Sequence, residues 1–311
     1  NIKYICEDTV DFTNYKIDKS FFKRKYQYSA VKNFFKKNGY GIIYNPTGSG
    51  KSFIGIRCIL TALQNDPTNK SLIIVNSIQS IRKDFKEELN KFLFNTNLKF
   101  QILDGRFQID ESNDIFVITV QTLNSLYNKT RRKTKNSAHA SLKKQYLTFI
   151  RFIKVLVVDE SHKHNTTKRK RLLNLFCNAY IRLFLSGTPF KRENELNEMQ
   201  ILSHQNKIVH TIKEETLVKQ KYLNDRVCIF INCYSPALQN RRFPNAVKFN
   251  AFLLNYLAND IMRNELIEVI NKTAKIFNIK TVFITNFIKQ GWKLGRQLNL
   301  PFISGSHNIY R

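Results

Sequence analysis

The chain has 311 residues, with 51 Lys or Arg against 23 Asp or Glu, so its formal net charge is +28. Apolar residues make up 42% of it, which excludes an intrinsically disordered chain, and its five Cys form no CxxC pair that would indicate a zinc or redox site. The charge favours a polyanionic partner, nucleic acid before an anionic membrane surface, with a lysine-rich solvated surface as the plain alternative.

Short apolar runs alternate with helical patterns between residues 40 and 190. The runs that we expect to form strands are 39–44, 71–75, 99–103, 114–120, 154–158 and 181–186, and the predicted helices between them are 51–64, 79–93 and 142–152. Most of the runs are almost continuously apolar, which is typical of parallel strands covered on both faces. The pattern therefore predicts a doubly wound parallel α/β sheet.

Two basic segments, 128–144 and 162–171, follow strand ends, where open α/β sheets place their sites. Solvated loops are the alternative for both. Beyond residue 190 the pattern is polar and mixed, with one strand candidate at 226–234. A helical pattern then covers 246–277, and strand candidates at 280–287 and 300–305 flank a predicted helix at 288–298, which indicates the opening of a second α/β unit.

The stretch NPTGSGKS (45–52) joins the first strand run to the first predicted helix. Gly48 and Gly50 can adopt positive φ and let the backbone approach a phosphate, and the N–H groups that open a helix favour an anion. Lys51 can reach the β- and γ-phosphates, and the Ser52 hydroxyl can hold Mg²⁺. The setting predicts a P-loop, although its first residue is Asn where Gly or Ala is usual, and a chance Gly-containing loop is the alternative.

Two further motifs lie at the ends of later strand runs. In KVLVVDESH (154–162), Asp159 is suited to hold Mg²⁺ and Glu160 to polarise the attacking water. An acidic strand end without function is the alternative, and the P-loop roughly a hundred residues earlier argues against it, because the two elements bind Mg·ATP together. The third motif, LFLSGTPF (183–190), leaves a strand into a tight turn, which could also be a plain β-turn.

In this order and spacing, GSGKS, DESH and LSGTP resemble motifs I, II and III of the DExH-type helicases of superfamily 2. Other segments are similar to the adenine-contacting segment, motif Ia, motif Ib and motif IV of that family; these are RKYQYSAV (24–31), LIIVNSIQSIRKDFKEEL (72–89), VITVQTL (117–123) and TVFITNFIKQGWKLGRQLNLPFISG (281–305). The last resembles phage repair and recombination helicases of the UvsW kind, and also the broader XPB-like and restriction-translocase branch.

The resemblance implies a domain order. A RecA-like ATP-binding domain is expected over 21–190, after an N-terminal extension at 1–20, and a connecting segment at 191–245 is expected to lead into a second RecA-like domain that begins at 246–311. Because the chain opens with Asn and motifs V and VI are not found, we expect a truncated start and a truncated second domain, without the arginine finger of motif VI.

The resemblance also implies roles for individual residues. Catalysis is assigned to Lys51, Asp159 and Glu160, and coupling between nucleotide state and movement to His162, Ser186 and Thr188. The expected nucleotide contacts are Gln27, Thr47, Gly48, Ser49, Gly50, Lys51 and Ser52, with Ser52 and Asp159 on Mg²⁺. The expected nucleic-acid contacts are Gln121, Thr122, Arg131, Arg132 and Lys133.

The sequence thus predicts an ATP-dependent helicase or translocase that acts on nucleic acid, DNA before RNA, with ATP as its small-molecule substrate and no membrane partner. We expect an intracellular, soluble protein, with a viral or phage origin as one option. One alternative is a motor that translocates on duplex DNA without unwinding it, as in restriction or remodelling. The other is a basic nucleic-acid-binding module whose P-loop is degenerate, which only Asn45 favours.

Overall fold

The computed structural model describes residues 11–78, 81–131, 137–164, 167–188, 207–224, 261–278, 281, 283–284 and 288–301. The chain divides into two compact units, residues 1–226 and 227–311. The first unit is built on a seven-stranded sheet, and the described part of the second holds two helices.

The strands of the sheet all run parallel, in the order β3-β4-β2-β5-β6-β1-β7. Their bounds are β1 (Tyr40–Tyr44), β2 (Lys70–Val75), β3 (Phe100–Leu103), β4 (Ile115–Thr119), β5 (Ile153–Val158), β6 (Ile181–Ser186) and β7 (Ile208–Thr211). The first six agree with the runs expected from the sequence to about one residue at each end. The predicted doubly wound parallel sheet is therefore confirmed.

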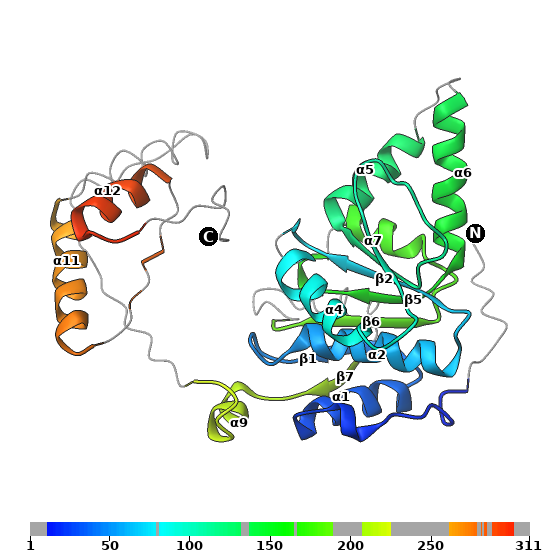
Figure 1. Ribbon diagram of the computed structural model, residues 1–311, viewed down its shortest axis with the longest axis horizontal. Helices are drawn as coiled ribbons and strands as arrows, with labels where there is room; N and C mark the ends of the chain where they lie inside the picture. The colour runs from blue at the N-terminus through cyan, green and yellow to red at the C-terminus, as the bar shows by residue number, and fades with distance from the viewer. Residues whose placement is uncertain are drawn as a thin grey trace. The chain divides into compact units, whose positions relative to one another are not determined.

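Helices cover both faces of this sheet (Figure 1). One face packs against α1 (Lys25–Lys36), α2 (Lys51–Asn65) and α4 (Glu87–Leu93), and the other against α5 (Val120–Arg131), α6 (Ser137–Phe152) and α7 (Thr167–Asn174). The shorter elements of this unit are η1 (Lys19–Phe21), the π-helical η2 (Ile81–Lys86), η3 (Ser161–His164) and α9 (Glu214–Lys219). Over the described residues no helix is both long and apolar enough to cross a membrane.

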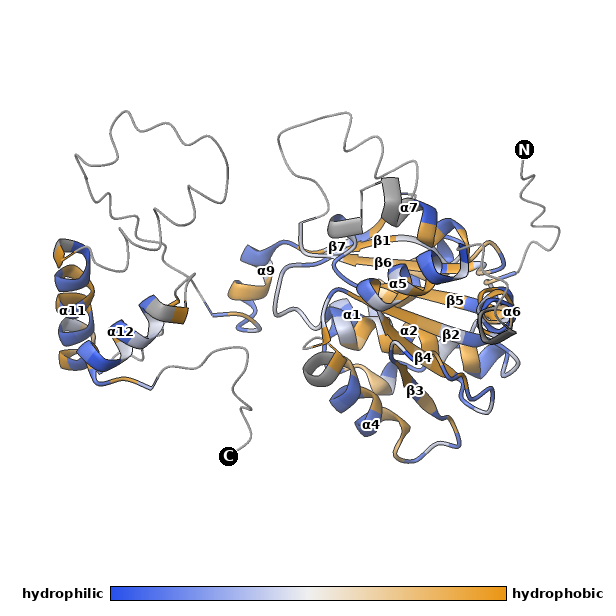
Figure 2. Cartoon of the chain, turned by 90° about the horizontal axis from the view of Figure 1, so that it is seen from above, coloured by the Kyte–Doolittle hydropathy of each residue, from blue (hydrophilic) through white to orange (hydrophobic). Residues whose placement is uncertain are grey.

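The core consists of two apolar layers, one on each side of the sheet. Successive residues of a strand point to opposite faces. In β2, Ile73 and Val75 belong to the layer under α1, α2 and α4, whereas Leu72 and Ile74 belong to the layer under α5, α6 and α7, and all four are fully buried. Figure 2 shows the apolar strands between helices whose outer surfaces are hydrophilic. Each such side chain contributes about 1.5–3 kcal/mol through burial.

Several elements differ from the sequence prediction. Helices α1, α5 and α7 were not predicted, and the basic segments 128–144 and 162–171, interpreted as interruptions, are helical over much of their described length. The buried residues Val120, Leu123 and Leu126 give α5 only a narrow apolar stripe in a mostly polar sequence, and such a stripe is hard to distinguish from a loop. The predicted helix 79–93 consists of η2 followed by α4.

Strand β7 lies in the segment 191–245, and it pairs with β1 at the edge of the sheet. The strand candidate at 226–234 lies outside the described residues, as do most of those at 280–287 and 300–305.

The second unit contains α11 (Ile261–Ile276) and α12 (Ile288–Leu298). The predicted helix 288–298 matches α12, and α11 accounts for the described part of the pattern at 246–277. The Gln297 amide of α12 donates to the Glu268 carboxylate of α11 at 3.3 Å, and Leu294 and Leu298 are buried.

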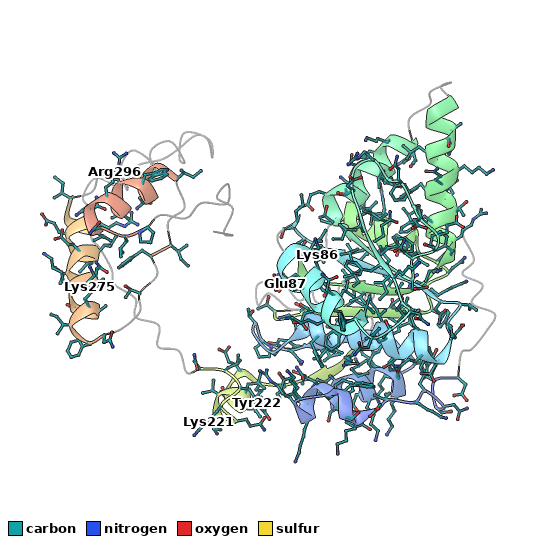
Figure 3. The ribbon with its side chains drawn as sticks, in the orientation of Figure 1. Lys86, Glu87, Lys221, Tyr222, Lys275 and Arg296 are labelled. Carbon is teal, nitrogen blue, oxygen red and sulfur yellow. The ribbon has the colours of Figure 1, made fainter. Side chains whose placement is uncertain are left out.

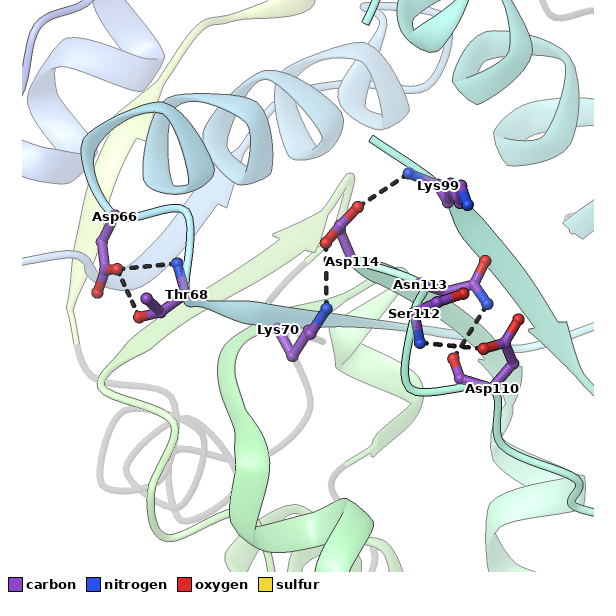
Figure 4. Close-up of polar contacts among 8 residues, drawn as sticks. All are labelled: Asp66, Thr68, Lys70, Lys99, Asp110, Ser112, Asn113 and Asp114. Atoms are coloured by element: carbon purple, nitrogen blue, oxygen red, sulfur yellow. Dashed lines mark hydrogen bonds and ion pairs between the residues drawn. The ribbon is translucent and has the colours of Figure 1, made fainter. Parts of the chain in front are cut away.

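Polar contacts join the amino ends of β2 and β4 to the turn before β3 (Figure 4). One carboxylate oxygen of Asp114 lies 3.1 Å from Lys70 Nζ, and the other accepts the backbone N–H of Lys99 at 2.9 Å. The side chains of Lys70 and Asp114 are only 25% and 17% exposed. Asp66 and Asp110 each accept backbone N–H bonds within nearby turns. Asp114 therefore helps to hold three neighbouring strands in register.

We expect Asp114→Ala to lower the free energy of unfolding by about 2 kcal/mol, because it removes a charge-assisted hydrogen bond and leaves a partly buried ammonium without its counter-charge. Denaturant unfolding followed by circular dichroism measures this. Asp104→Ala is the matched control, since its pair with Arg106 is largely exposed and should contribute little. Equal destabilisation in both variants would contradict the role assigned to Asp114.

Candidate active site

The loops that carry the sequence motifs open at one edge of the sheet, because the carboxyl ends of parallel strands all point the same way. Strand β1 leads into the stretch 45–50, β5 into Asp159, and β6 into the Ser186–Thr188 segment. Since β6 lies between β1 and β5, the three motifs are neighbours along that edge.

The loop between β1 and α2 has the left-handed turns that a phosphate cradle requires. Gly48 and Gly50 have φ angles of 82° and 79°, and Gly50 is the N-cap of α2. Lys51, the first residue of the helix, is only 8% exposed, and its Nζ lies 3.4 Å from the Pro46 carbonyl. An ammonium has three donors, so this single contact leaves Lys51 able to bind phosphate.

Two residues of α1 brace this loop. The Tyr26 hydroxyl donates to the Ser49 carbonyl at 2.5 Å. Gln27 is buried, and a Cβ placed on Gly50 would lie 2.9 Å from its Nε2. Its Oε1 is also buried and has no hydrogen-bond partner among the described residues. Gln27, predicted as the adenine contact, therefore presents a buried acceptor directly beside the P-loop.

The segment after α9 also contacts the loop, which the sequence did not indicate. A Cβ on Gly48 would lie 3.0 Å from Leu223 Cδ2. The Arg24 guanidinium lies over the Tyr222 ring at 4.9 Å, and the Tyr222 and Tyr26 rings are 6.0 Å apart (Figure 3 labels Tyr222). The only sequence signal was a short apolar pair in a polar stretch, which is too weak to identify a site element.

The acidic pair after β5 has an unusual backbone. The Asp159 N–H donates to the Ile74 carbonyl at 2.9 Å, which extends the pairing of β5 with β2, and Asp159 is 8% exposed. The next residue, Glu160, has a φ of 48°, a left-handed conformation that residues with a Cβ rarely adopt. This bend ends the strand and turns the Glu160 side chain toward His162.

The predicted coupling residues form one polar row with Glu160. His162 Nδ1 lies 3.3 Å from a Glu160 carboxylate oxygen and 2.9 Å from Ser186 Oγ. Ser186 Oγ in turn accepts the Thr188 N–H at 3.1 Å. The acidic pair and the loop after β6 are therefore directly linked.

The loop after β6 also lies on the P-loop. The Asn45 N–H donates to the Ser186 carbonyl at 3.1 Å. A Cβ on Gly187 would lie 3.3 Å from Lys51 Nζ and 3.4 Å from Thr47 Oγ1. The structure thus brings together all three predicted motifs.

Ser52 and Asp159 are the predicted Mg²⁺ ligands. A hydroxyl and a carboxylate are the hard oxygen donors that Mg²⁺ prefers, and the ion commonly takes one or two protein ligands together with phosphates and waters. This donor set fits a Mg·nucleotide. Within the part of the chain that the structure describes, no group of three or more His, Cys, Asp or Glu gathers as a separate metal site.

The predicted nucleic-acid contacts lie at two ends of α5. Thr122 is in the first turn, where its N–H donates to the capping hydroxyl of Thr119 at 3.1 Å. Gln121 is exposed, and its Nε2 donates to the Asn76 carbonyl at 2.8 Å. Arg131 ends the helix about 15 Å further on, exposed, with its guanidinium over the Tyr127 ring. Arg132 and Lys133 lie outside the described residues.

A family model matches this chain, and a curated protein is similar to it. Residues 21–191, more than half of the chain, match the family model described as "Type III restriction enzyme, res subunit". A curated protein named "Putative helicase 22", from Sulfolobus islandicus filamentous virus, is 29% identical over 223 residues. That alignment covers 70% of this chain but only 37% of the viral protein.

Two solved structures are more distant. The Sulfolobus solfataricus SWI2/SNF2 ATPase core in complex with dsDNA is 22% identical, with a TM-score of 0.43, over 64% of this chain and 38% of that one. The UvsW helicase from bacteriophage T4 is 19% identical, with a TM-score of 0.45, over 61% of this chain and 60% of that one. Similarity at this level does not bear on function.

We expect Gly50→Ala to weaken nucleotide binding by about tenfold, because a Cβ at positive φ is strained and would press on the Gln27 amide. Titration with a fluorescent ATP analogue and Mg²⁺ measures this. Gly105→Ala is the control, since a Cβ there meets no atom within 4 Å. Unchanged affinity in Gly50→Ala would argue against a phosphate cradle at this loop.

Proposed function

The chain belongs to the family of the type III restriction enzyme res subunit, and from this premise we propose that it is an ATP-driven motor of superfamily 2 that moves along or unwinds nucleic acid. The observation that carries the proposal is the meeting of three motifs at one sheet edge. Lys51 lies beside the Gly187 turn, and His162 contacts both Glu160 and Ser186. The name of the viral relative, a helicase, agrees with it.

In this proposal the P-loop binds the phosphates. Its N–H groups at residues 48–52 surround the anion, and Lys51 adds a point charge. The buried Gln27 Oε1 accepts a hydrogen bond from the exocyclic amino group of adenine, which selects ATP over guanine nucleotides. Ser52 and Asp159 hold Mg²⁺, which when bound neutralises charge on the phosphate oxygens.

Glu160 is the residue proposed to orient and deprotonate the attacking water. Its carboxylate contacts His162, which in turn contacts Ser186, and Ser186 accepts the Thr188 N–H. In this proposal, a shift of Glu160 when the γ-phosphate leaves is passed along this row. We assign coupling to this row because it joins the acidic pair to the loop that lies on the P-loop.

A motor that translocates on duplex DNA without separating the strands is the second candidate, and the restriction-enzyme family favours it. A strand-displacement assay beside a triplex-displacement assay separates the two. Displacement of the triplex strand alone would identify a duplex translocase. The net charge of +28 supports nucleic acid as the partner in either case, with DNA proposed before RNA.

We expect Lys51→Ala to weaken Mg·ATP binding by at least about tenfold, because the variant no longer places a positive charge on the β- and γ-phosphates. Glu160→Gln should keep the affinity and lose turnover, because an amide cannot take the proton. Equilibrium titration and steady-state phosphate release measure the two effects. Lys91→Ala, which removes an exposed lysine from α4, should change neither. ATP bound equally well by the parent and Lys51→Ala would refute the P-loop assignment.

Replacing Arg131, Arg132 and Lys133 together by Ala should reduce the salt dependence of single-strand binding, by about one slope unit for each phosphate that these side chains neutralise in the parent. Fluorescence anisotropy at a series of salt concentrations measures the slope. The matched control replaces Lys32, Lys36 and Lys37, three exposed lysines at α1, which covers the other face of the sheet. A slope unaltered by the first triple variant would show that the end of α5 does not bind phosphate.

A further inference from the structure

Three adjacent strands end in a chain of hydrogen bonds that the motifs did not predict. The strands are β4, β2 and β5, and the residues that follow them include Gln121, Asn76 and Asp159. Gln121 Nε2 donates to the Asn76 carbonyl at 2.8 Å, and Asn76 Nδ2 donates to the Asp159 carbonyl at 3.2 Å. Each bond runs from a side chain to a main-chain oxygen, so each fixes the orientation of a peptide group in the next loop.

The last of these peptide groups is the one that joins Asp159 to Glu160. Glu160 has a φ of 48°, and such a conformation persists in a residue with a Cβ only where the surroundings hold it. Relaxation of Glu160 to a right-handed conformation would rotate this peptide and swing the Asp159 carbonyl away from Asn76. The Asn76 amide therefore opposes that rotation.

Glu160 is thus held at two points. Its carboxylate lies 3.3 Å from His162 Nδ1, and the peptide before it is bound by Asn76. The two contacts come from opposite sides of β5, since β6 carries the partner of His162 and β2 leads into Asn76. Removal of the bond on the β2 side would leave the side-chain contact in place but free the backbone to turn.

We propose that Asn76 is a positioning residue that sets the backbone of Glu160 and transmits the engagement of nucleic acid at Gln121 to it. This inference rests on the proposed function, in which Glu160 activates water and the start of α5 contacts a strand. Gln121 is exposed although its amide is bonded to Asn76, so a phosphate or sugar can draw the amide away from the Asn76 carbonyl. The Asn76 loop then shifts, and the Asp159 carbonyl shifts with it.

The relay ends at Glu160, which acts on turnover, so its readout is the change in kcat that a saturating strand causes. The experiment titrates the full chain with a fluorescent ATP analogue and Mg²⁺, with and without a saturating single-stranded oligonucleotide. Steady-state ATP turnover is measured beside it. For the parent we expect the oligonucleotide to change kcat by about fivefold or more, because it alters how Glu160 is held.

Asn76→Ala and Gln121→Ala should each bring the change in kcat caused by the oligonucleotide close to onefold, and Asn76→Ala should keep the parent's nucleotide affinity. Asn76→Ala should also lower kcat by about tenfold, because Glu160 is no longer held in its orientation. A general structural defect would instead weaken nucleotide binding itself. Gln121→Ala alters only an exposed side chain, so it tests the relay even if Asn76→Ala fails to fold.

The chain offers matched controls. Asn178 Nδ2 donates to the Arg151 carbonyl at 2.9 Å, and Gln101 Nε2 donates to the Gln108 carbonyl at 2.8 Å, so Asn178→Ala and Gln101→Ala remove the same two kinds of bond elsewhere. Both should keep the parent's coupling.

Full coupling and full kcat in Asn76→Ala and Gln121→Ala would overturn the relay and leave the proposed function standing. A parent that binds nucleotide without coupling also overturns the relay, whereas a parent that binds no Mg·ATP overturns the proposed function itself.

Discussion

The parallel pairing of all seven strands is the constraint on which the rest of this molecule depends. It sends every strand's carboxyl end to one edge, so motifs separated by many residues in the sequence meet there. It also requires helices on both faces, since the inner strands are apolar on both sides. Gly55 shows how closely this covering is packed, because a Cβ there would lie 3.0 Å from Leu185 in β6 and 3.3 Å from Val157 in β5.

Gly48, Gly50 and Glu160 are three left-handed residues in the loops of the candidate site. Gly48 and Gly50 adopt positive φ without steric cost, but Glu160 does so against a preference of about 1–2 kcal/mol. The sheet can sustain this, because each buried aliphatic side chain beneath it contributes a similar amount. The contacts to His162 and Asn76 then determine which way the strained turn faces. The free energy gained by burying the core thus offsets the strain of the Glu160 conformation at the edge of the sheet.

Two polar rows meet at that turn and lead away from it in opposite directions. One runs through His162 to the loop after β6 and so to the P-loop, and the other runs through Asn76 to the start of α5. In a nucleic-acid motor the first row would respond to the nucleotide and the second to the strand. Because both rows end at Glu160, they would connect the nucleotide to the nucleic-acid strand through a few hydrogen bonds, with no long-range rearrangement within this unit.

The sequence by itself determined six of the seven strands, because continuous apolar runs are local patterns, and its motifs placed Lys51, Asp159 and Ser186 in or beside the loops that follow strands. Helix α5 was not predicted, because its buried residues form only a narrow apolar stripe in a mostly polar sequence. Tyr222, Leu223 and Asn76 could be recognised only in the tertiary structure. Their roles depend on the spatial order of the strands and on contacts over long sequence separations, and neither leaves a local pattern in the chain.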